Sequence, residues 1–113
     1  IRWREPVPEW ISRVIASVDH DLRRRWTTTT MAEQAGMSAD GFARAFRRSM
    51  GRTPAEYLRE VRIREACRLL RGTEESIERI SHQVGLRNRH HFTRVFGRIT
   101  GTTPARYRRS EKS

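Results

Sequence analysis

Residues 76–108 read SIERISHQVGLRNRHHFTRVFGRITGTTPARYR, and this stretch predicts two short helices joined by a tight turn. Ser76 and Asn88 are suitable N-caps, and Gly85 and Gly101 are suitable C-terminal stops. Between these residues the apolar side chains recur every three or four positions, as one buried helix face requires. They are Ile77, Ile80 and Val84, followed by Phe92, Val95, Phe96 and Ile99. The pattern is typical of a helix-turn-helix.

The same pattern occurs earlier in the chain, in TTTTMAEQAGMSADGFARAFRRSMGRTPAEYLR at residues 27–59. The first helices of the two stretches align at an offset of 49 residues and the second helices at an offset of 50. The difference arises because the turn of the later stretch, GLRN, is one residue longer than the turn of the earlier one, GMS. Each copy closes with Gly, Thr-Pro-Ala and Tyr, a start signal for the next helix, to which Glu56 adds a capping box in the first copy. The chain therefore contains two helix-turn-helix units, at about residues 27–59 and 76–109.

The segments around these units complete an all-α organisation, since no strand pattern occurs. Glu9 to about Leu22 predicts an amphipathic helix. Arg23–Arg25 are interpreted as its solvated end, with phosphate contact as the alternative. We expect a linker or tail at 1–8, a first subdomain at 9–52, a linker helix at 53–71, a second subdomain at 72–109 and a disordered tail at 110–113, with the last helix ending near Tyr107.

The charge of the chain indicates a polyanionic partner. Its 113 residues carry 24 basic and 13 acidic side chains, a net charge of +11, and every basic residue except Lys112 is arginine. A high-GC genome also favours arginine codons, but it does not explain the excess over acids. Nucleic acid is favoured over an anionic membrane surface. No apolar run approaches the about 18 residues that a membrane span needs, so no membrane partner is expected.

The sequence offers little for catalysis or metal binding. Cys67 is the single cysteine, which excludes an internal disulfide and a cysteine-rich zinc site and fits a reducing compartment such as the cytoplasm. His90 and His91 are adjacent, so a helix separates them by about 100° and they form a weak metal pair. A DNA-repair methyltransferase with a similar regulatory module would need zinc-type cysteines. We therefore expect no enzyme activity, no cofactor and no metal.

The stretch IERISHQVGLRNRHHFTRVFGRITGTTPARYR resembles the second-half signature of the DNA-binding domain of the AraC/XylS family of bacterial transcription regulators nearly end to end, and RIREACRLL resembles its linker helix. The likeness covers about residues 9–109. It implies seven helices in two helix-turn-helix subdomains joined by a long linker helix, each subdomain placing one recognition helix in a major groove of double-stranded DNA. Family members often carry a separate ligand-sensing or dimerising domain, to which residues 1–8 could connect, and RNA polymerase is a further candidate partner.

A recognition helix buries one side and offers the other to DNA. Burying Phe42 and Phe46 in the first unit, and Phe92 and Phe96 in the second, leaves two outward faces. The outward residues are Asp40, Ala43, Arg44 and Arg47 in the first unit, and Arg89, His90, Thr93, Arg94 and Arg98 in the second. The resemblance places the base-contacting positions at Asp40, Ala43, Arg44, His90, Thr93 and Arg94.

The chemistry of these side chains suits base edges. Arg44 and Arg94 suit guanine, where a bidentate contact is worth about 1–3 kcal/mol of discrimination. Ala43 and Thr93 can meet a thymine methyl group, and His90 can donate or accept a hydrogen bond. Each of these residues could instead be an ordinary solvated side chain. Phosphate contacts are expected from Arg47, Arg48, Arg89 and Arg98.

Three features depart from the family pattern. Gly41 and Ala43 leave few side chains for contact on the first recognition face. Asp40 places an acid at a base-contacting position, where it can accept from cytosine or simply favour the helix N-terminus and repel phosphate. Gly97 stands where the first unit has Arg47, so one phosphate contact is missing. We therefore expect the second unit to carry more of the sequence discrimination.

Three classes of partner remain open at this point. The first is specific DNA, held by two recognition helices in major grooves about 34 Å, or about 10 bp, apart. The second is DNA of any sequence, bound by charge alone with a steep salt dependence. The third is a protein such as RNA polymerase, with DNA secondary. The repeated helix-turn-helix pattern favours the first.

Overall fold

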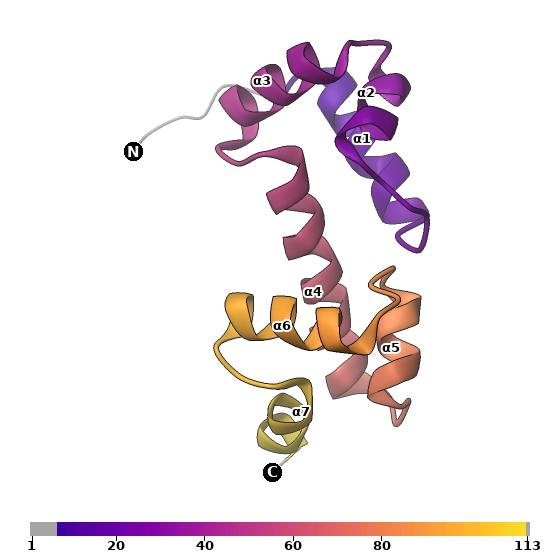
Figure 1. The fold of residues 1–113 in the computed structure, drawn as a ribbon, viewed down its shortest axis with the longest axis vertical. Coiled ribbons are helices and arrows are strands. Elements are labelled where there is room, and N and C mark those ends of the chain that lie inside the picture. Colours follow the sequence, from indigo (N-terminus) through magenta and orange to yellow (C-terminus); the bar gives the residue numbers. More distant parts are fainter. Residues whose placement is uncertain (1–6, 113) are drawn as a thin grey trace. The chain divides into compact units, whose positions relative to one another are not determined.

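The computed structural model describes residues 7–112, which form seven helices and no strand (Figure 1). The helices are α1 (Glu9–His20), α2 (Thr28–Ala35), α3 (Ala39–Met50), α4 (Pro54–Gly72), α5 (Ile77–Gln83), α6 (Arg89–Thr100) and α7 (Pro104–Lys112). The predicted all-α fold is confirmed. The predicted linker at residues 1–8 lies outside the described residues except for its last two, of which Pro8 is the N-cap of α1.

The chain divides into two compact units. Among the described residues, the first comprises residues 7–21 and 26–58, and the second comprises residues 22–25 and 59–112. In the first unit, α2 contacts both α1 and α3. Its fully buried side chains come from all three helices, and they include Ile11, Val18, Met31, Phe42 and Phe46. The stacked apolar faces predicted from the sequence therefore form the core of this unit.

The second unit has its own core. It joins the C-terminal part of α4 to the helices that follow, with α6 contacting both α5 and α7. The buried cluster contains Ile63, Ala66, Leu70, Ile80, Val84, Leu86, Phe92, Val95 and Phe96. Ile99, which the helical spacing placed inward, is 43% exposed because it lies in the last turn of α6.

The unit boundaries differ from those expected. Residues 53–71 were assigned to a linker helix, but the two units divide within α4, between Leu58 and Arg59. The rest of α4 belongs to the second unit because Ile63, Ala66 and Leu70 face its core. Helix α1 ends at His20 rather than near Leu22, and residues 22–25 belong to the second unit.

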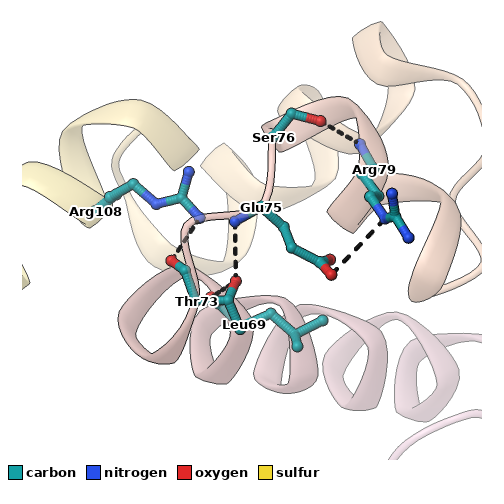
Figure 2. Close-up of polar contacts among 6 residues, drawn as sticks. All are labelled: Leu69, Thr73, Glu75, Ser76, Arg79 and Arg108. Atoms are coloured by element: carbon teal, nitrogen blue, oxygen red, sulfur yellow. Dashed lines mark hydrogen bonds and ion pairs between the residues drawn. The ribbon is translucent and has the colours of Figure 1, made fainter.

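The end of α4 is held by a network of polar contacts (Figure 2). Arg108 donates from Nη2 to the carbonyl of Thr73 at 3.2 Å, as Figure 2 shows. Its Nε donates to the carbonyl of Leu70, also at 3.2 Å. The Thr73 hydroxyl donates to the carbonyl of Leu69 at 2.8 Å and accepts from the main-chain N–H of Glu75 at 3.2 Å. The last carbonyls of a helix lack donors from the following turn, and these contacts supply side-chain donors to two of them, Leu69 and Leu70, and to the carbonyl of Thr73 directly after the helix.

The same network extends the last helix. The sequence predicted an end near Tyr107 and a disordered tail over 110–113, whereas α7 continues to Lys112. Because Arg108 is fixed against the end of α4, the helix is held beyond Tyr107. Ser113 lies outside the described residues.

Candidate nucleic-acid interface

Helix α3 is built to offer one polar face. The Ser38 hydroxyl accepts from the main-chain N–H of Gly41 at 3.2 Å and caps the start, and Gly51 ends the helix at φ 74°. Phe42 and Phe46 are fully buried, with ring centroids 5.6 Å apart. Of the predicted contact residues, the exposed ones are Asp40, Arg44, Arg47 and Arg48, while Ala43 is half-buried at the edge of this face.

Helix α6 repeats this design. Asn88 Oδ1 accepts from the main-chain N–H of His91 at 3.0 Å, and Gly101 ends the helix at φ 79°. Phe92 and Phe96 are fully buried, with centroids 5.8 Å apart. The predicted contact residues Arg89, His90, Arg94 and Arg98 are exposed.

Thr93 is the half-buried member of the α6 face. Its hydroxyl donates to the carbonyl of Arg89 at 2.9 Å, so the polar group is occupied within the helix. The methyl group of Thr93 remains for an apolar contact, and it suits the methyl group of a thymine. Ala43 on α3 offers a methyl group at the corresponding position of the repeat.

The repeated Thr-Pro-Ala-x-Tyr phrase braces both recognition helices. Tyr57 of α4 packs edge-on against Phe46 at 5.6 Å, and Tyr107 of α7 packs edge-on against Phe96 at 5.7 Å. The hydroxyls of Thr53 and Thr103 each accept from a main-chain N–H three residues on, at 3.1 Å. Each unit therefore fixes its buried Phe pair with the helix that follows it, as the sequence repeat indicated.

Among residues 7–112, no ion pair joins an arginine of the two outward faces to an acid. Ion pairs in this part of the chain include those of Arg13 with Glu9, Arg68 with Glu65 and Arg79 with Glu75. None involves an arginine predicted to contact DNA. A guanidinium that is exposed and unpaired is available to a phosphate or a guanine edge at little desolvation cost.

Sequence reasoning missed the arginines that hold residues 22–25. Arg62 of α4 is only 8% exposed, and its Nη2 donates to the carbonyls of Leu22 at 3.3 Å and Arg24 at 2.9 Å. Arg87, in the turn before α6, donates to the carbonyl of Arg23 at 3.1 Å. Burial, and then the charge of Arg87, lower the pKa of Arg62 from its ordinary value. No sequence signal pairs these groups, because all three acceptors are main-chain carbonyls.

Other kinds of site are not evident in the described part of the chain. No three His, Cys, Asp or Glu side chains among residues 7–112 gather closely enough to hold a metal ion. None of the helices described is long and apolar enough to cross a membrane. Cys67 is half-buried, and burial raises the pKa of its thiol.

Comparison with known proteins identifies the family. A family model described as a helix-turn-helix domain matches residues 31–110. The chain is 31% identical over 103 residues to the transcriptional activator RhaR of Klebsiella pneumoniae, covering 91% of this chain and 37% of that protein. The solved DNA-binding domain of AdpA, in complex with a target DNA, matches with a TM-score of 0.87 and 29% identity over 90% of this chain and 92% of that one. The chain belongs to the AraC-type helix-turn-helix family.

Two further relatives define how far the likeness of this AraC-type domain extends. The Bacillus subtilis protein AdaA, a bifunctional transcriptional activator and DNA repair enzyme, is 31% identical over 107 residues, which cover 95% of this chain and 51% of AdaA. The C-terminal domain of AraT from Geobacillus stearothermophilus shares the fold, with a TM-score of 0.89 at 24% identity over 94% of this chain and 88% of that one. The chain thus spans about half or less of the curated relatives' length.

Proposed function

We propose that this AraC-type domain binds a specific double-stranded DNA sequence, with α3 and α6 in adjacent major grooves, and thereby regulates bacterial transcription. The observation that carries the proposal is the outward face of α6, where exposed, unpaired Arg94 stands beside exposed His90 and the methyl group of Thr93. Arg94 is assigned to guanine, where a bidentate contact gives about 1–3 kcal/mol of discrimination. Arg89 and Arg98 on the same helix are assigned to phosphate.

Helix α3 contributes in the same way, with a sparser face. Arg44 is assigned to a guanine edge, Ala43 to a thymine methyl, and Arg47 and Arg48 to phosphate. Asp40 lies in the first turn of α3, where an acid favours the positive end of the helix. It can also accept from cytosine. The second unit is therefore proposed to supply more of the sequence discrimination, and bound sites selected from random DNA should be better defined under α6 than under α3.

The parent protein and its partners are part of the same proposal. The chain covers about half or less of its curated relatives, so a further ligand-sensing or dimerising domain is proposed for the parent protein. RNA polymerase is proposed as its partner at promoters. No enzyme activity is assigned to this chain. A cytoplasmic location at the nucleoid follows from a DNA partner.

The deciding experiment is a titration of a selected duplex and a scrambled duplex, each at two salt concentrations. The wild-type chain should prefer the selected duplex at both. Arg94→Ala should cost about 1–3 kcal/mol of binding free energy on the selected duplex only, because a lost base contact matters only where that base is present. Arg68→Ala is the matched control, since it removes the same charge from an arginine of α4 that is paired with Glu65. Equal affinity of the wild-type chain for both duplexes would instead indicate a binder that uses charge alone.

A further inference from the structure

Residues 22–25, called the 22–25 segment below, carry three consecutive arginines and belong to the second unit. They follow α1 in the sequence, and a solvated helix end was the expected role. In the structure the side chain of Leu22 packs against the core of the second unit. The segment is therefore part of the unit that holds α6, although α1 and α2 on either side of it are not.

The segment is held by its backbone. The carbonyls of Leu22, Arg23 and Arg24 accept hydrogen bonds from Arg62 and Arg87 at 2.9–3.3 Å. Three consecutive main-chain acceptors bound on one side fix the path of the chain. The side chains of Arg23 and Arg25 are not used in this anchoring, and both are exposed.

The turn before α6 is shaped to receive the segment. Gly85 has φ 85°, and a Cβ atom on it would lie 2.6 Å from the carbonyl oxygen of Leu22 and 3.0 Å from Nε of Arg62. Only a residue without a side chain permits this approach. Arg87 comes directly before Asn88, the N-cap of α6. The segment is thus in hydrogen-bond contact with the turn that leads into the recognition helix.

Positive charge is concentrated here without a matching acid. Arg62 is buried, and its Nε has no hydrogen-bond partner. Within the described residues Arg23, Arg25 and Arg87 form no ion pair, and Asp21, the acid nearest to Arg23 and Arg25 in the sequence, is exposed. Packing arginines together costs free energy through their mutual repulsion, and a polyanion relieves that cost. The positive end of the α6 dipole adds to the same potential.

We propose that the 22–25 segment is part of the DNA-contact surface of the second unit, with Arg23 and Arg25 binding backbone phosphates beside the major groove that α6 enters. This inference rests on the proposed function, because it assigns further contacts to the same duplex. The segment adds affinity without sequence information, since phosphate contacts are the same for every base pair.

The test is Arg23→Ala/Arg25→Ala in the 113-residue chain, measured on the selected and scrambled duplexes over about 50–200 mM salt. Because the anchors are carbonyls, the variant keeps its fold, which its circular dichroism should confirm. The slope of log K against log salt should fall by about 1.8, at about 0.9 for each lost phosphate. Affinity should fall by the same factor on both duplexes, and Arg23→Lys/Arg25→Lys should restore most of the slope.

Arg64→Ala/Arg68→Ala is the matched control, because it removes two positive charges from exposed positions of α4. A slope change equal to that of this control would overturn the assignment of the 22–25 segment. So would a loss confined to the selected duplex, which would indicate base contact. Equal affinity of the wild-type chain for both duplexes would contradict the proposed function but not the role of the 22–25 segment. In that case the slope of log K against log salt still tests whether Arg23 and Arg25 contact phosphates.

Discussion

Replacing Gly85 by alanine should destabilise the second unit more than replacing any other glycine with the same backbone conformation. The left-handed conformation alone costs an L-residue about 1–2 kcal/mol. Gly85 adds a steric cost, because the new Cβ would lie 2.6 Å from a main-chain oxygen, that of Leu22. Relief requires the 22–25 segment to move and to break the hydrogen bonds that Arg62 donates to it. A hydrogen bond to a charged group contributes about 1.5–3 kcal/mol.

Gly101→Ala is the matched control. Gly101 has φ 79° in the same unit, and a Cβ there would meet nothing within 4 Å. The free energy of unfolding of the control should therefore fall only by the conformational cost, about 1–2 kcal/mol. That of Gly85→Ala should fall further, by about 1.5–3 kcal/mol for each hydrogen bond of Arg62 that breaks. Urea unfolding followed by far-UV circular dichroism gives both free energies of unfolding. A difference below about 0.5 kcal/mol, within the usual scatter of surface substitutions, would refute the anchoring of the segment.

Three further predictions concern other positions. Gly97→Arg should strengthen binding to every duplex and steepen the slope of log K against log salt by about 0.9, the value for one added phosphate contact. The side chain fits, because a Cβ at Gly97 has its nearest contact at 3.8 Å, and Gly97→Ala controls for the helix propensity gained. Arg108→Ala should lower the free energy of unfolding by about 1.5–3 kcal/mol by releasing two carbonyls at the end of α4, whereas exposed Arg106→Ala should stay within about 0.5 kcal/mol, as measured by urea unfolding. Because burial raises the pKa of the Cys67 thiol, its alkylation rate in the folded chain should reach half of its maximum at a higher pH than in the urea-unfolded chain, where an ordinary thiol is half ionised at about 8.5.

The sequence predicted those parts of the fold that depend on local signals. Ser38 and Asn88 were expected as N-caps and cap their helices through their side chains. The spacing of the Phe pairs predicted which faces of α3 and α6 are buried, because two aromatic residues four positions apart define one side of a helix. The DNA contacts assigned to the opposite faces stay predictions.

The features that escaped prediction depend on contacts between distant residues. Arg62 is an arginine in a helix rich in arginine, and nothing local distinguishes it from its exposed neighbours. Its burial depends on main-chain carbonyls 38 and 40 residues earlier. The length of α7 was underestimated for a similar reason, because its polar sequence is typical of a tail and its anchor, Arg108, binds carbonyls 35 and 38 residues away.

The 22–25 segment belongs to the second unit but precedes most of the first unit in the sequence, and this limits which fragments of the chain can fold. A fragment that starts at residue 59 would contain every helix of the second unit from the middle of α4 onward. It would still lack Leu22 and the three carbonyls that receive Arg62 and Arg87. The fragment would therefore lose the hydrogen bonds that Arg62 donates and the packing of Leu22 against the core, and both losses lower its free energy of unfolding. Although the chain reads as a tandem repeat, its second half is therefore not a self-sufficient module and cannot be excised at the repeat boundary without leaving part of itself behind.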